Sequence, residues 1–213
     1  MKLLVALPCM DMVNTMFMRS LLGMRRVGKC EFGIACSSLI YDARNSLAQK
    51  AIVEKFDRVL WLDSDMTFEP DFLERLTADM DEGRDFVAGL YVTRKPPSKP
   101  VIFNKVGYER VGETMEVIPK ATTYWDYPKD DIFEIAAAGF GGVLMNTSLI
   151  KEIYDKYGLP FTPVLGFGED ISFCLKAAEL GKKMYCDSRI KMGHVGIYTY
   201  DEETYLKGKD DAQ

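Results

Sequence analysis

Two aspartates follow an apolar segment in the first third of the chain, within the sequence WLDSDM that begins at Trp61. Asp63 and Asp65 are two positions apart, where an apolar strand would end and the backbone would turn. Ligands of open α/β sheets bind beyond the carboxyl ends of the strands, and carboxylate oxygens are ligands for hard divalent cations. The pair therefore indicates a cation site. The alternative is a solvated turn that caps the next helix, because aspartate is common in turns.

A second acidic pair, Glu169–Asp170, follows Gly166 and Gly168 and directly precedes the helical apolar pattern of residues 171–178. Carboxylates at a helix N-terminus are favoured by the helix dipole, so capping is one interpretation. The other is catalytic, since a helix would hold an aspartate rigidly enough to accept a proton from an attacking hydroxyl.

The only histidine, His194, lies between Gly193 and Gly196, where backbone and solvent can approach closely. An isolated histidine is commonly a structural or surface residue. An imidazole together with two carboxylates is, however, a suitable ligand set for Mn²⁺. We therefore predict a metal site of Asp63, Asp65 and His194 that holds Mn²⁺ or Mg²⁺.

The elements that must position these residues can be read from hydrophobic periodicity. Apolar, β-rich runs occur at 3–7, 32–36, 59–62 and 86–90, and amphipathic helical patterns lie between them. Strands that alternate with helices of this length predict βαβ units and a parallel sheet. A helix start is predicted at Pro70, with acidic neighbours near the positive end of the dipole.

The second half of the chain has a different pattern. Three prolines within 95–100 predict a loop, and 101–128 contains short β-like runs separated by glycine, proline and charged residues. Strands are predicted at 133–138 and 142–146, and helices at 149–157 and 171–180, the last ending at Gly181. We predict one domain over 1–213, with a nucleotide-binding half at 1–93 and an acceptor-side catalytic half at 94–213.

Composition limits the classes of partner. The net charge of −5 without clustered lysine and arginine argues against nucleic acid. No apolar run is long enough for an integral membrane segment, and the first apolar residues are interrupted too early for a secretory signal. The five cysteines lack metal-site spacing, which favours free thiols. We expect a cytoplasmic protein.

The order of these motifs, from Arg44–Asn45 through Asp63–Ser64–Asp65 and the glycines of 139–142 to Glu169–Asp170 and His194, resembles the GT-A fold glycosyltransferases. It is most similar to small bacterial and phage members related to the inverting family two. The resemblance implies an α/β GT-A fold, with a mostly parallel central sheet flanked by helices and a small antiparallel acceptor-side part.

The same resemblance implies roles for individual residues. Asp65 and His194 would bind the metal, Asp63 the metal or the ribose, and Asp170 would deprotonate the acceptor hydroxyl. The remaining residues that it assigns to the donor or acceptor side are Pro8, Asp11, Arg44 and Ser64 for the nucleotide sugar, and Gly141, Gly142 and Glu169 for the acceptor. Arg44 would lie near the base or diphosphate, or else be a surface arginine. Tyrosines 198, 200 and 205 would pack on the surface or fold over the site.

The function implied is a hexosyltransferase activity. A sugar would pass, with inversion, from a UDP-sugar, or alternatively a GDP-sugar, to an acceptor sugar, glycan or other hydroxyl compound. One alternative is a sugar-phosphate nucleotidyltransferase, although such proteins open with a glycine-rich loop where this chain has Pro8–Cys9–Met10–Asp11. The other is a non-catalytic module that binds a nucleotide sugar or a partner.

Overall fold

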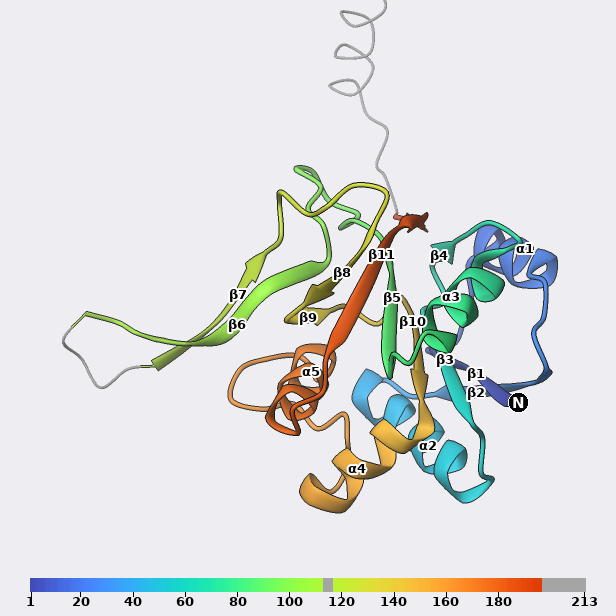
Figure 1. The fold of residues 1–213 in the computed structure, drawn as a ribbon, viewed down its shortest axis with the longest axis horizontal. Helices are drawn as coiled ribbons and strands as arrows, with labels where there is room; N and C mark the ends of the chain where they lie inside the picture. Colours follow the sequence, from blue (N-terminus) through green and yellow to red (C-terminus); the bar gives the residue numbers. More distant parts are fainter. Residues whose placement is uncertain (113–116, 197–213) are drawn as a thin grey trace, which may run out of the picture.

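A seven-stranded sheet forms the centre of the protein in the computed structural model, which describes residues 1–112 and 117–196 (Figure 1). Tyrosines 198, 200 and 205, expected to pack on the surface or to fold over the site, lie outside this range. In spatial order, the strands are β2 (Lys29–Cys36), β1 (Lys2–Cys9), β3 (Arg58–Leu62), β10 (Gly142–Asn146), β5 (Phe86–Leu90), β11 (Met184–Lys191) and β8 (Ile132–Ile135).

Five of these strands run in one direction, and β10 and β8 run in the other. The predicted α/β architecture with a mostly parallel central sheet is confirmed. β10 is inserted between β3 and β5 and is antiparallel to both. Its first residue, Gly142, is therefore opposite Leu62 at the end of β3, which brings the glycine turn before β10 next to Asp63.

Helices cover both faces of the sheet (Figure 1). They are α1 (Thr15–Gly23), α2 (Ile40–Val53), α3 (Phe72–Asp81), α4 (Thr147–Tyr157) and α5 (Glu169–Glu179). Alternate residues of β1 point to opposite faces, so Leu3 and Val5 belong to the core under α1 and α3. Leu4 and Ala6 belong to the core under α2, α4 and α5. Burial on both faces explains why the central strands are continuously apolar.

The helix boundaries agree with the local signals. α3 begins just after Pro70, and α5 is followed by Gly181, which has the positive φ of 72° expected after a helix end. All five cysteines are free thiols, as predicted. Among the described residues, there is no helix with the length and apolar character required to span a bilayer.

The region predicted as short β-like runs folds instead into one long hairpin, β6 (Ile102–Arg110) and β7 (Val117–Thr123), which extends away from the sheet (Figure 1). The run predicted as one strand at 133–138 is divided: β8 joins the large sheet, whereas β9 (Ala137–Ala138) pairs with β6. The apolar pattern of a segment does not specify which strand it will pair with. Periodicity therefore could not indicate that the two ends of this run belong to different sheets. A last small sheet pairs β4 (Met66–Thr67) with β12 (Gly193–His194).

Candidate functional site

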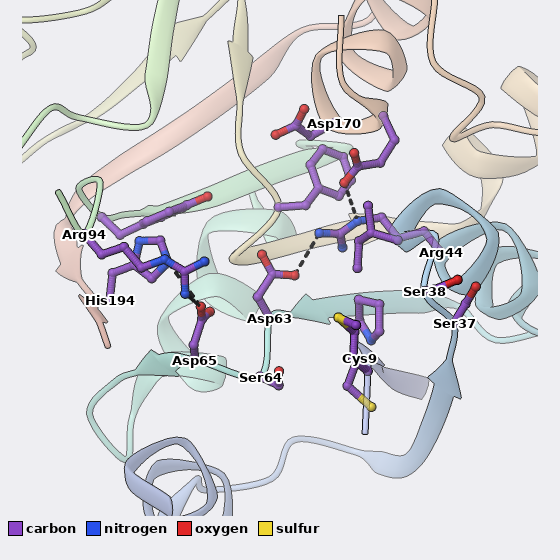
Figure 2. A pocket seen from close by; sticks show the side chains of 16 residues that line it. Cys9, Ser37, Ser38, Arg44, Asp63, Ser64, Asp65, Arg94, Asp170 and His194 are labelled. Carbon is purple, nitrogen blue, oxygen red and sulfur yellow. Dashed lines mark hydrogen bonds and ion pairs between the residues drawn. The ribbon is translucent and has the colours of Figure 1, made fainter. Parts of the chain in front are cut away.

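A cavity of about 380 Å³ opens at the carboxyl ends of β1, β2, β3 and β5, where ligands of open α/β sheets bind (Figure 2). The residues that line it are Pro8, Cys9, Met10, Ser37, Ser38, Ile40, Arg44, Asp63, Ser64, Asp65, Tyr91, Arg94, Phe140, Glu169, Asp170 and His194. Most of the residues that the sequence singled out therefore meet in one place.

Arg44, in the first turns of α2, is the buried centre of this cavity wall, with only 2% of its side chain exposed. Its Nη2 donates to Asp63 Oδ1 at 2.8 Å, and its Nε donates to Glu169 Oε1 at 3.1 Å. Burial alone would lower the pKa of Arg44, but the charges of Asp63 and Glu169 raise it. Arg44 thus stays charged, and its two salt bridges link the end of β3 to the start of α5.

The salt bridge with Arg44 orients the Asp63 side chain toward Arg44 and away from His194 (Figure 2). Burial raises the pKa of Asp63, while the Arg44 guanidinium acts to lower it. The aromatic rings of Trp61, Phe140 and Phe161 surround the guanidinium, with centroids 5.4 to 6.0 Å from its carbon. The surface-arginine alternative for Arg44 is therefore wrong.

His194 lies at the cavity because its strand, β12, pairs with β4, and β4 begins at the residue after Asp65. The Val195 N–H donates to the Asp65 carbonyl at 2.8 Å, and His194 Nε2 lies 3.5 Å from Asp65 Oδ2. His194 Nδ1 lies 3.0 Å from the carbonyl oxygen of Val92, which can only accept, so Nδ1 carries the hydrogen. In the neutral imidazole, Nε2 then presents its lone pair beside the Asp65 carboxylate.

This arrangement suits a divalent cation with two protein ligands. Metal-binding histidines usually donate their other ring N–H to a carbonyl or carboxylate, as His194 does to Val92. The remaining positions around the cation would be left for phosphate oxygens and water. The guanidinium of Arg94, half exposed, contacts Asp65 Oδ2, the oxygen that faces His194, so a cation held between that oxygen and His194 would displace it.

Asp63 does not join this pair. Within residues 1–112 and 117–196, no three side chains of histidine, cysteine, aspartate or glutamate gather in a way that could hold a metal. The structure brings together two of the three predicted ligands, Asp65 and His194, and directs Asp63 to Arg44 instead. The physical reason is that a buried guanidinium requires a carboxylate partner.

Asp170 lies in the first turn of α5, whose N-cap is Gly168. It accepts a hydrogen bond from the backbone N–H of Ile171 at 2.7 Å and borders the cavity (Figure 2). Burial, and then the negative charge of Glu169, raise the pKa of Asp170 to about 6. A carboxyl group with that pKa can accept a proton near neutral pH.

Three predicted site residues are not part of the cavity wall. Asp11 is exposed and lies outside the lining. Gly141 and Gly142 are buried in tight packing rather than open to a substrate: a Cβ on Gly142 would be 2.3 Å from Met192 Sδ, and one on Gly141 would be 3.0 Å from the Tyr91 ring. These glycines leave space that neighbouring side chains occupy around the turn before β10.

Sequence reasoning missed Cys9, Ser37, Ser38 and Tyr91. Cys9 is the last residue of β1, and the two serines directly follow β2. The two strands pair in register, so the position of these residues at the strand ends was the available signal. Tyr91 follows β5 and forms a wall of the cavity. Its hydroxyl accepts from the Gly141 N–H at 3.3 Å, and burial raises its pKa.

Comparison with known proteins identifies the fold. No protein-family model matches the chain, and a search of curated proteins finds no match. Among solved structures, the chain is similar to A197 from STIV, with a TM-score of 0.63 and 18% identity over 92% of this chain and 87% of that one. It is also similar to GalNAc-T7, solved with UDP, GalNAc and Mn²⁺, with a TM-score of 0.50 and 15% identity.

The second match covers 79% of this chain and 33% of GalNAc-T7, so the chain spans about a third of that protein. At these identities, the likeness concerns the fold. The protein has a mixed α/β fold of the GT-A type, with a large, mostly parallel sheet between layers of helices.

Proposed function

We propose that this protein transfers a sugar from a nucleotide-diphosphate sugar, preferably a UDP-sugar, to an acceptor hydroxyl with the aid of Mn²⁺ or Mg²⁺. The observation that carries the proposal is the meeting of Asp65, His194 and Asp170 in one cavity at the carboxyl ends of the sheet strands. Asp65 and His194 would serve as the two protein ligands of a cation, and Asp170 places a carboxyl group of raised pKa in the same cavity.

The nucleoside is proposed to lie near the ends of β1 and β2. Ser37 and Ser38 border the cavity there and offer hydroxyls to a ribose or base, and Pro8 and Cys9 line it from the neighbouring strand β1. The salt bridge with Arg44 fixes the position of Asp63. The remaining lone pairs of its carboxylate can accept a hydrogen bond from a ribose hydroxyl. The diphosphate would then be next to Asp65 and His194.

The chemical step is a single displacement. Asp65 and His194 would hold the cation, which when bound supplies positive charge for the leaving diphosphate. The acceptor oxygen forms a bond to the anomeric carbon as the bond from that carbon to the phosphate oxygen breaks. Asp170 takes the proton of the acceptor hydroxyl, and attack from the face opposite the diphosphate inverts the configuration.

The first test of this proposal is calorimetric titration of UDP and GDP, each with and without Mn²⁺. We expect UDP binding that requires Mn²⁺ and is weakened at least about tenfold in Asp65→Ala, because one of two protein ligands is lost. Asp126→Ala is the matched control, since Asp126 is an exposed aspartate outside the cavity wall and has no predicted role in binding.

Equal affinity of the Asp65→Ala variant for UDP in the presence of Mn²⁺ would contradict the cation site. Binding of UDP-sugars without release of UDP, across a broad panel of acceptors, would instead support a non-catalytic binding module. Release of pyrophosphate from a nucleoside triphosphate and a sugar phosphate would point to nucleotidyl transfer.

A further inference from the structure

A second cavity, of about 540 Å³, lies beside the first. The two share three lining residues, Tyr91, Arg94 and His194, so a molecule in the second cavity lies next to the proposed cation site. The rest of the second cavity is formed by the 93–99 loop and Val101. We refer to it as the loop cavity.

The 93–99 loop is closed at its base by two hydrogen bonds between Thr93 and Lys99. The Thr93 N–H donates to the Lys99 carbonyl at 2.8 Å, and the Lys99 N–H donates to Thr93 Oγ1 at 3.0 Å. Between these residues, Pro96 and Pro97 have φ angles restricted by their rings. The loop therefore presents its side chains from a backbone with few alternative conformations, which lowers the entropic cost of binding.

The loop cavity has a charge opposite to that of the first. Lys95, Lys99 and Arg94 line it, and no carboxylate does. Across residues 1–112 and 117–196, neither lysine has a carboxylate partner, and both are exposed. The first cavity contains Asp63, Asp65, Glu169 and Asp170. In a chain of net charge −5, unpaired lysines gathered at one cavity indicate an anionic ligand.

The walls of the loop cavity are apolar. The Tyr91 ring, Val101 and the two prolines provide surfaces against which the C–H face of a sugar ring can pack. Arg94 lies at the boundary between the cavities. When a cation replaces Arg94 at Asp65, the exposed guanidinium of Arg94 is free to face the loop cavity as a third positive group.

We propose that the loop cavity binds the acceptor, and that the acceptor carries a phosphate or carboxylate group recognised by Lys95 and Lys99. This inference rests on the proposed function. It assigns the anion to the acceptor because the diphosphate of the donor has its own place at Asp65 and His194. An anionic group on a soluble sugar and the phosphate of a lipid headgroup have the same chemistry for these lysines.

The test is the charge-reversed double variant Lys95→Glu/Lys99→Glu, with Lys151→Glu/Lys156→Glu on α4 as a control of equal charge change. Glucose 6-phosphate, glucuronate and uncharged glucose are titrated by NMR with UDP and Mg²⁺ present, so that the donor site is filled with a diamagnetic ion. We expect both anionic sugars to bind the wild type better than glucose. Their affinity should fall about tenfold in the loop variant and remain unchanged in the control.

Flotation with phosphatidylcholine vesicles, with and without phosphatidic acid, distinguishes the sources. Lysine-dependent binding to the phosphatidic acid vesicles but not to the sugars assigns the site to a lipid phosphate, and the reverse assigns it to a soluble anion. Equal affinity of the loop variant and wild type for every anion, or no preference for anions over glucose, overturns the proposal. UDP titration reports separately on the proposed function, because Lys95 and Lys99 lie outside the first cavity.

Discussion

Asparagine in place of Asp170 is expected to slow sugar transfer by a factor on the order of 10² or more, while Mn²⁺-dependent UDP binding stays near the wild-type affinity. Asparagine has almost the same shape as aspartate but does not accept the proton of an attacking hydroxyl. The measurement is kcat for transfer together with the UDP dissociation constant. A wild-type rate in this variant would remove Asp170 from the mechanism.

The pH dependence of transfer provides a second readout for Asp170. Its pKa is raised to about 6, and only the ionised carboxylate can accept a proton. The rate should therefore fall as the pH drops through about 6, because Asp170 becomes protonated. The residual activity of Asp170→Asn should lack this acidic limb. A limb that persists unchanged in the variant would assign the titration to another group.

Measuring the stability of the same variant tests whether unfolding causes the loss of activity. The folded pKa of about 6 lies above the unfolded value of about 3.9, so the native state holds the proton more tightly. The contribution of Asp170 to stability therefore decreases as the pH rises from about 4 to 6, and ionised Asp170 destabilises the fold above that range. Asp170→Asn should be more stable than wild type at pH 7.5, by about 1 to 2 kcal/mol, and no more stable at pH 4.

Methionine in place of Arg44 is expected to lower the free energy of unfolding by about 3 to 5 kcal/mol, the usual effect of removing one partner from a buried ion pair. Arg44 is 2% exposed and holds Asp63 and Glu169, which would be left in the cavity wall without their cation. Urea unfolding measures the change. Arg25→Met is the control, because the Arg25–Glu74 pair is exposed and screened by solvent, so its removal should change the free energy of unfolding far less.

A triple variant distinguishes the contribution of charge to the stability lost in Arg44→Met from the contribution of packing. If the loss arises from unpaired carboxylates, adding Asp63→Asn and Glu169→Gln to Arg44→Met should restore much of the stability. If it arises from lost contact with the surrounding aromatic rings, the triple variant should remain as unstable as the single one. An Arg44→Met protein within about 1 kcal/mol of wild type would contradict the role of Arg44 as the buried partner of Asp63 and Glu169.

The sequence by itself determined many of the elements and the positions of several candidate site residues along them. Apolar runs alternating with amphipathic helices predicted a parallel α/β sheet because periodicity depends on which faces of a segment are buried, and that information is local. The same logic placed Asp63, Asp65 and Asp170 at a strand end and a helix start, positions that face the carboxyl edge of such a sheet. Their assigned roles in catalysis and metal binding stay predictions.

Only the tertiary structure decided how these elements meet. The insertion of β10 between β3 and β5, and the pairing of β12 with β4 that brings His194 to Asp65, depend on hydrogen bonds between distant segments. Local sequence carries little information about such partners. The pairing of Asp63 with Arg44 was hidden for the same reason, since neither residue type indicates which opposite charge it will meet. Burial then explains the pairing. A guanidinium that is excluded from water forms salt bridges with nearby carboxylates, and Asp63 is therefore paired with Arg44.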